Sequence, residues 1–120
     1  MTILTIDLGT QSVRAAFVNK IGHIDSITQL KQEVDSPYDG WAQQQPKKWW
    51  NLTKRAIQQL LEKTKIEAKS IQGIGVCGQM HGPVGIDGNG EITTKWTQIW
   101  CDKRCENICD LIKKDYDEQD

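Results

Sequence analysis

The sequence predicts an α/β fold in which a mixed sheet begins as a three-stranded antiparallel meander and has helices packed alongside. Three observations support this prediction. Short β-rich runs separated by turns open the chain, apolar residues at helical spacing follow, and a glycine-containing apolar run comes after them. The 120 residues suit one domain, large enough to bury roughly two thirds of the surface of its unfolded chain.

The meander is expected to consist of residues 3–7, 13–18 and 24 to about 34, each of which is rich in β-branched or apolar side chains. Leu4 and Ile6 alternate with polar residues in the first strand. Because alternate side chains of a strand point to the same face, both are expected to face the core.

A helix is predicted over residues 46–63. Pro46 suits its first position, because the N–H that proline lacks has no partner there in any case. The apolar residues that follow recur at helical spacing and are expected to cover one face of the sheet, with the tryptophan pair as the anchor. This stripe consists of Trp49, Trp50, Ala56, Ile57, Leu60 and Leu61.

Residues 73–77 are expected to form a buried strand that continues the mixed sheet after the helix. Val76 should lie in the core, and the glycines of this run allow a neighbouring chain to approach closely. The strand leads into residues 78–82, a polar loop with glycine at both ends.

The last third of the chain predicts a hairpin, a short strand and a helix. An Asp-Gly-Asn-Gly turn at residues 87–90 joins two short runs, 83–86 and 91–92. Residues 98–100 are expected to form the last strand, and Asp102 to cap the helix that follows. The buried stripe of that helix is expected to consist of Cys105, Ile108, Cys109 and Ile112.

The charge pattern argues against nucleic-acid and anionic-membrane partners, because the net charge is −1 and opposite charges are interspersed. The first apolar run is broken by Thr5 and Asp7 and has no basic flank, so neither a signal peptide nor a membrane span is expected. A soluble, cytoplasmic protein is the default expectation.

The cysteines are interpreted as structural. Cys101, Cys105 and Cys109 recur every four residues, with no Cys-x-x-Cys pair and no histidine at metal-finger spacing. In a reducing compartment, thiols of this kind behave as small hydrophobes. We therefore expect Cys105 and Cys109 to be buried, reduced and free of metal.

The turn after the first strand carries the groups that a polyphosphate requires. Gly9 lets the backbone approach a ligand, Thr10 and Ser12 offer hydroxyl donors, and successive N–H groups of a turn can bind an anion. Asp7 is placed to hold Mg²⁺ through water, since this ion uses few protein carboxylates beside substrate phosphates. No Gly-x-x-x-x-Gly-Lys-Ser/Thr run is present, which excludes a P-loop. On the hairpin alone, an ordinary polar turn is an equal alternative.

Four motifs occur in order over nearly the whole chain. They are Asp7-x-Gly9-Thr10-x-Ser12-x-Arg14, Gly40-Trp41-x-Gln43-x-x-Pro46 with Trp49-Trp50, Gly78-Gln79-Met80-His81-Gly82, and Trp100-x-Asp102-x-Arg104. Together they resemble the start of the FGGY carbohydrate kinases, a family within the actin-like ATPase superfamily. The third motif most resembles the xylulose kinase group, since glycerol kinases carry an Arg-Glu pair in place of Met80-His81. Gln43 and Gln45 stand where relatives often have acidic residues, which leaves the role of that loop open.

The resemblance implies a ribonuclease H/actin-like fold, with residues 1–120 forming part of the first lobe and a cleft between two lobes. It also implies ATP-dependent phosphorylation of a sugar hydroxyl, with Asp7 helping to organise Mg²⁺ and the phosphates. A polyol suits an imidazole beside an apolar wall, although a histidine bonded to the loop backbone is the alternative for His81. The implied ATP-phosphate residues are Thr10, Gln11, Ser12 and Arg14, and the implied sugar-side residues are Met80, His81, Trp100 and Asp102.

Members of this family run to several hundred residues. The resemblance therefore implies that the catalytic base, the adenine pocket and the second lobe lie beyond position 120, and residues 1–120 alone are expected to be inactive. The leading interpretation is the N-terminal part of a ketose kinase similar to xylulose kinases, acting on a small-molecule sugar. The alternatives are a kinase of this family for another ketose, a polyol or a sugar acid, and a non-catalytic truncated product that binds sugar or phosphate weakly. Whether the protein forms a homodimer is left open by the sequence.

Overall fold

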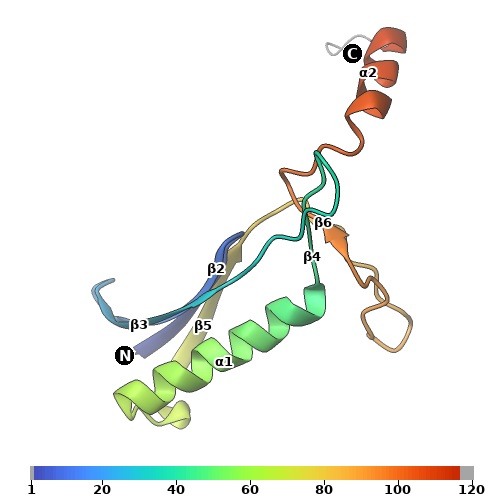
Figure 1. Ribbon diagram of the computed structural model, residues 1–120. Coiled ribbons are helices and arrows are strands. Elements are labelled where there is room, and N and C mark those ends of the chain that lie inside the picture. The colour runs from blue at the N-terminus through green and yellow to red at the C-terminus, as the bar shows by residue number, and fades with distance from the viewer. Residues whose placement is uncertain (1, 117–120) are drawn as a thin grey trace.

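The computed structural model describes residues 2–116 and forms a sheet with one long helix beside it, followed by a loop-rich segment and a second helix (Figure 1). This arrangement confirms the predicted α/β class. Within this range, no helix combines the length and the apolar character that a membrane span requires. In chain order the elements are β1 (Thr2–Leu8), β2 (Ser12–Asn19), β3 (Ile24–Lys31), β4 (Gln43–Gln44), α1 (Pro46–Thr64), a 3₁₀ turn (Ala68–Ser70), β5 (Ile71–Gly78), β6 (Thr97–Gln98) and α2 (Glu106–Asp115).

The main sheet has the strand order β3-β2-β1-β5. β1 pairs antiparallel with β2, and β2 with β3, which confirms the three-stranded meander. β3 ends at Lys31, earlier than predicted, and one further backbone bond, from the N–H of Gln32 to the carbonyl of Gln11 at 2.8 Å, continues its pairing beyond β2. After the crossover through α1, β5 pairs parallel with β1. The carboxyl ends of β1 and β5 therefore lie at the same edge of the sheet.

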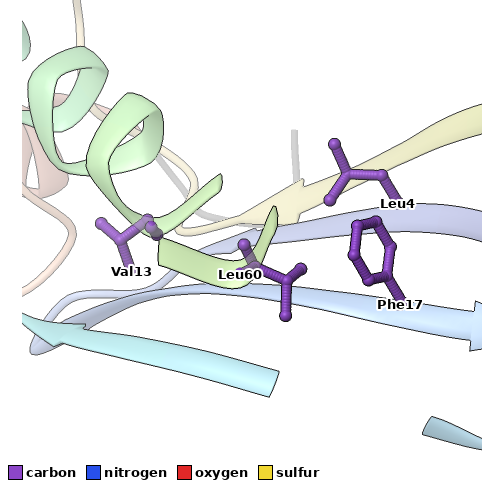
Figure 2. Packing of buried hydrophobic residues seen from close by; sticks show 6 residues of the cluster. Leu4, Val13, Phe17 and Leu60 are labelled. Atoms are coloured by element: carbon purple, nitrogen blue, oxygen red, sulfur yellow. The ribbon is translucent and has the colours of Figure 1, made fainter. Parts of the chain in front are cut away.

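α1 covers one face of the sheet by packing against β2 and β3. Its residue Leu60 is fully buried in a cluster with Leu4, Val13 and Phe17, which Figure 2 shows from close by. Burying one Leu or Phe side chain contributes about 1.5–3 kcal/mol, so this cluster holds the helix on the sheet. The core positions that the structure confirms are Leu4, Ile6, Ile57 and Leu61.

The tryptophan pair does not anchor α1 to the main sheet in the predicted way. Trp50 is 60% exposed, whereas Trp49 is half-buried and donates its indole N–H to Gln44 Oε1 at 3.0 Å. Adjacent residues of an α-helix point roughly 100° apart, so the two rings cannot face the same neighbour. Trp49 therefore ties the start of α1 to β4.

β5 is an exposed edge strand and not the buried strand that the sequence predicts. Ile74 is 66% exposed and Val76 is 72% exposed. The reason is that α1 lies over β2 and β3, while β5 pairs with β1 alone among the described strands. Of the two glycines in the run 73–77, Gly73 has a close neighbour, because an added Cβ would lie 3.3 Å from Ile3 Cδ1, whereas at Gly75 the nearest atom, Thr5 Cγ2, would lie at an ordinary 3.9 Å.

The segment between β5 and α2 is mostly loop. The predicted hairpin is reduced to one isolated bridge between Ile86 and Ile92, around the turn at residues 87–90. Near this bridge, the N–H of Gly85 donates to the side-chain hydroxyl of Thr94, in place of a backbone bond between two paired strands. The last strand is the two-residue β6, one position earlier than predicted and paired with β4.

α2 projects away from the sheet (Figure 1), and its N-cap residue is Cys105. Asp102 therefore does not cap this helix, contrary to the prediction. The predicted burial of its apolar stripe is also wrong, because no helix or strand among residues 2–116 makes an extensive contact with α2. All four cysteines are exposed free thiols. The exposed residues of the predicted stripe are Cys105, Ile108, Cys109 and Ile112.

Candidate functional site

The segments that the sequence predicts to bind ligands leave the sheet where β1 and β5 end. In the parallel register Asp7 lies beside Cys77. Just beyond this pair, the turn at residues 9–11 and the loop that begins at Gln79 start from the same edge. The N–H of Gln79 donates to the carbonyl of Leu8, with 2.8 Å between N and O, which joins the two segments. Carboxyl ends of parallel strands are a common position for ligand sites in α/β folds.

Asp7 and Arg14 face each other across the first hairpin. Arg14 Nη1 lies 2.6 Å from Asp7 Oδ2, and Arg14 Nε donates to Gln29 Oε1 at 3.3 Å. Among the described residues, Asp7 Oδ1 accepts only a weak hydrogen bond from the thiol of Cys77, at 3.7 Å. The side chains of Asp7 and Arg14 are 35% and 42% exposed. The pair therefore presents a carboxylate and a guanidinium at the edge of the sheet.

The turn after β1 keeps its central N–H groups free for a ligand. The N–H of Gly9 closes the turn on the carbonyl of Ser12 at 3.0 Å, but no group in residues 2–116 accepts from the N–H of Thr10 or Gln11. A Cβ on Gly9 would lie 3.1 Å from the same Ser12 oxygen and would crowd the turn. Beside the turn lies an open hollow of about 640 Å³, lined by Gln11, Ser12, Arg14 and residues of β3 and its extension.

The hydroxyl of Thr10 joins this turn to two later segments. It accepts a hydrogen bond from the indole N–H of Trp100 at 2.9 Å and donates to Gln79 Oε1 at 3.1 Å. Trp100 follows β6 and is 62% exposed. The structure thus brings together Thr10, predicted on the phosphate side, and Trp100, predicted near the sugar.

Gln44 of β4 accepts three hydrogen bonds beneath the turn. Its Oε1 lies 3.0 Å from Trp49 Nε1 and 2.8 Å from Gln79 Nε2. A third donor, Gln32 Nε2, lies 3.3 Å from the same oxygen. Gln44 is 2% exposed, so these bonds form in a region that excludes water. A satisfied buried polar network of this kind rigidifies the groups that it joins.

The buried side-chain amides of Gln44 and Gln32 also hold the backbone of the turn at residues 9–11. Gln44 Nε2 donates to the carbonyls of Thr10 and Glu33, at 2.8 and 3.1 Å. Gln32 Nε2 donates to the carbonyl of Gly9 at 2.7 Å. The position of the turn therefore depends on side chains from β4 and from the end of β3.

The loop after β5 presents Met80 and His81 to solvent. Met80 is 70% exposed, and His81 is exposed with no hydrogen-bond partner among the described residues. The predicted alternative, a histidine bonded to the loop backbone, is therefore not observed in this part of the chain. His81 has a backbone φ of 63°, a left-handed conformation that costs a non-glycine residue roughly 1–2 kcal/mol. Backbone strain of this kind is concentrated at ligand sites and switches.

Asp102 is a buried partner of Arg104, with side chains 4% and 17% exposed. Asp102 Oδ2 lies 2.7 Å from Arg104 Nη2 and accepts from the N–H of Ala42 at 2.7 Å. Hydrogen bonding from Arg104, aided by the N–H of Ala42, lowers the pKa of Asp102 although burial opposes that shift. The Arg104 guanidinium also lies 3.7 Å from the ring centroid of Trp41 and donates to Gln43 Oε1. Asp102 therefore fastens the β4 segment to the chain that precedes α2.

Three glutamines hold the site together and were not predicted from the sequence as site residues: Gln32, Gln44 and Gln79. Gln79 lies inside the Gly-Gln-Met-His-Gly motif, in which only Met80 and His81 were predicted to contact the sugar. Gln44 lies in a run of three glutamines directly before Pro46. The run of three glutamines was the sequence feature that could have indicated this network. A side-chain amide can donate and accept at once, so it can satisfy several buried backbone groups.

The antiparallel meander, with its first strand paired parallel to the strand after α1, places the chain in the class of actin-like ATPase folds. Within that class, the chain belongs to the FGGY family of carbohydrate kinases, because residues 2–120 match the N-terminal domain of that family. This confirms the family and the fold that the sequence motifs predict.

Two curated relatives and one solved structure illustrate the similarity. The chain is 35% identical over 119 residues to a xylulose kinase of Staphylococcus epidermidis. The aligned region covers 98% of this chain and 23% of that protein. It is 31% identical over 112 residues to a glycerol kinase of the same species, with 93% and 22% covered. A xylulose kinase structure from Brucella ovis superimposes with a TM-score of 0.84 at 28% identity, covering 96% of this chain and 24% of that one. The chain thus spans about a quarter of the length of these relatives.

Proposed function

We propose that the whole protein transfers a phosphoryl group from ATP to a hydroxyl of a ketose, as a xylulose kinase does. The observation that carries this proposal is the meeting of the turn at residues 9–11 with the loop at residues 78–82 at one sheet edge, joined by the bond between Thr10 and Gln79. Phosphoryl transfer requires positioning and charge neutralisation more than covalent chemistry by the protein. One edge that carries both segments would hold the two substrates close together.

On the nucleotide side, the free N–H groups of Thr10 and Gln11 would donate to phosphate oxygens. Arg14 would neutralise phosphate charge, because its guanidinium is 42% exposed and borders the hollow beside the turn. Ser12 is buried and lines this hollow, and its hydroxyl would be the further donor on this side. Charge-assisted bonds from such donors are about twice as strong as neutral ones.

The residues present fit a magnesium ion that is shared with the nucleotide. Asp7 offers one partly exposed carboxylate, and residues 2–116 contain no group of three or more potential metal ligands. Mg²⁺ is usually held by one or two carboxylates together with substrate phosphates and water. Asp7 would hold this ion, which when bound neutralises charge on the phosphates, while Arg14 fixes the carboxylate.

On the sugar side, Met80 and His81 would supply an apolar wall and an imidazole for the substrate hydroxyls. Both are exposed next to the turn, and the backbone strain at His81 fits a side chain held for binding. Trp100 would border this space, since it reaches Thr10. Asp102 would act indirectly by fixing the neighbouring backbone, because its oxygens already accept bonds from Ala42 and Arg104.

A polyol is the second candidate substrate, because a glycerol kinase is among the relatives at 31% identity. The two candidates are separated by an assay of ADP release by the whole protein with Mg-ATP and either xylulose, ribulose, gluconate or glycerol. We expect the highest kcat/KM with xylulose. A preference for glycerol would replace the ketose proposal by the polyol one, and no sugar-dependent ADP release from any of the four would contradict both.

A further inference from the structure

Gln79 is the first residue after β5, and three hydrogen bonds hold it in place. Its backbone N–H donates to the carbonyl of Leu8, with 2.8 Å between N and O. Its side-chain Nε2 donates to Gln44 Oε1 at 2.8 Å, and its Oε1 accepts from the Thr10 hydroxyl at 3.1 Å. Both ends of the side-chain amide are therefore used inside the site, one toward β4 and the other toward the turn at residues 9–11.

The direction of the two side-chain bonds is fixed from outside. The indole N–H of Trp49 can only donate, so the Gln44 atom that it meets must be the acceptor Oε1. Gln79 must then meet that oxygen with its Nε2, which leaves its Oε1 toward Thr10. The Thr10 hydroxyl accepts from the indole N–H of Trp100 and has its own hydrogen left to donate. A side chain at position 79 must therefore donate and accept at once, which glutamine does and methionine or an ionised glutamate does not.

The two residues proposed to contact the sugar follow Gln79 directly. His81 has a backbone φ of 63°, and a non-glycine residue keeps such a conformation only where its surroundings hold it. The side chains of Met80 and His81 are exposed, so neither is held by packing within residues 2–116. The bonds of Gln79 fix the chain immediately before this pair.

Thr10 faces the proposed nucleotide with its backbone and Gln79 with its side chain. No group in residues 2–116 accepts from the N–H of Thr10, which is free for a phosphate oxygen. A phosphate bound there would order Thr10 and, through its hydroxyl, the amide of Gln79. A ligand that orders part of a site lowers the entropic cost of ordering for the next ligand. Nucleotide and sugar should therefore strengthen each other's binding.

We propose that Gln79 is a positioning residue that couples the two substrates, because its amide transmits occupancy of the turn at residues 9–11 to Met80 and His81. This role rests on the proposed function, which makes the turn the phosphate site and the loop at residues 78–82 the sugar site. Gln79 contacts neither substrate and acts through Thr10 and through the chain that follows it. Coupling between two ligands is reciprocal, so each should tighten the binding of the other by the same factor.

The test measures the dissociation constant of xylulose for the whole protein by calorimetry, with and without Mg²⁺ and the non-hydrolysable nucleotide adenylyl imidodiphosphate. The ratio of the two constants is the coupling factor. In the wild type we expect xylulose to bind about fivefold or more tightly when the nucleotide is present. In Gln79→Met and Gln79→Glu at neutral pH the coupling factor should fall to about one, since neither side chain can donate to Gln44. General destabilisation of the loop would weaken both constants alike and would leave their ratio unchanged.

The matched control is Gln72→Met, which makes the same substitution at an exposed position of β5 and should keep the wild-type coupling factor. A coupling factor of one in the wild type, or a wild-type factor in both Gln79→Met and Gln79→Glu, would overturn the positioning role. An equal loss of coupling in Gln72→Met would do so as well. Sugar-dependent ADP release by the wild type would leave the proposed function standing in each of these cases, whereas its absence with all four acceptors would overturn both proposals.

Discussion

The indole N–H of Trp100 donates to the hydroxyl of Thr10, with 2.9 Å between Nε1 and Oγ1, although the two residues are 90 positions apart. The same hydroxyl donates to Gln79 in the loop after β5. One hydroxyl therefore joins the turn proposed for phosphate to both segments proposed for the sugar. A substitution of Thr10 should therefore affect both the phosphate side and the sugar side of the site.

Thr10→Val tests this role, because valine keeps the shape and removes the hydroxyl. We expect the KM for ATP to rise about tenfold in the whole protein, because the turn loses two hydrogen bonds, each worth about 0.5–1.5 kcal/mol. Steady-state kinetics with varied ATP measures this. Thr10→Ser keeps the hydroxyl and should remain near the wild-type value. An equal loss in both variants would contradict a specific role of the hydroxyl, because Thr10→Ser keeps it.

Gln44→Leu should lower the free energy of unfolding by about 1–3 kcal/mol, because it leaves the indole N–H of Trp49 and the carbonyl of Thr10 without partners. Urea denaturation measures this change. The neighbouring Gln45→Leu is the matched control, because the side chain of Gln45 makes no capping bond. Equal destabilisation by the two variants would contradict the central position of Gln44.

Asp102→Asn should lower the free energy of unfolding at neutral pH by about 1.5–3 kcal/mol. The pKa of Asp102 is lower in the folded protein than in the unfolded chain because Arg104 hydrogen bonds to the carboxylate. This pair therefore stabilises the fold fully above the unfolded-state pKa, and the contribution disappears as the pH falls through the folded-state pKa.

The difference in stability between wild type and Asp102→Asn should accordingly shrink as the pH falls below about 4. Urea titrations at neutral and acidic pH provide the comparison. Asp110→Asn, on the exposed helix α2, is the control and should show no comparable difference. A difference for Asp102→Asn that stays constant with pH would show that the ion pair is not its source.

The sequence predicted the local elements better than their burial. β1, β2 and α1 follow from alternation and helical spacing, which depend only on neighbouring residues. Val76 and Ile108 were predicted to be buried from the same patterns, but burial depends on which element packs against the strand or helix. In the described residues β5 and α2 have no such cover, and both side chains are exposed.

In the site, too, residues in local motifs were predicted, whereas residues whose partners are distant in the sequence were not. Asp7 and His81 were identified because they lie in short motifs beside turns, and the parallel pairing of β1 with β5 brings their segments together. Gln32 and Gln44 were missed because their partners are backbone groups distant in the sequence. A buried hydrogen-bond network of this kind has no local periodicity from which it could be predicted.

His81→Ala should raise the KM for the sugar about ten- to a hundredfold with a smaller effect on kcat, because it removes a proposed hydrogen bond worth roughly 1–3 kcal/mol. The control is His81→Asn, since asparagine tolerates the left-handed backbone and keeps a polar side chain. Steady-state kinetics at varied sugar concentration measure the sugar KM of both variants and so separate the effects of His81→Ala and His81→Asn. An unchanged sugar KM in His81→Ala would remove residues 78–82 from the sugar site.

The most direct test of the central claim is the kcat of Asp7→Asn in the whole protein at saturating Mg-ATP and sugar. Asparagine keeps an acceptor for Arg14 but removes the negative charge that would hold the metal beside the phosphates. Because that charge would act most strongly in the transition state, we expect kcat to fall at least about a hundredfold with little change in the KM for the sugar. A kcat near the wild-type value would show that the turn after β1 is an ordinary polar hairpin and would contradict the proposed phosphate site.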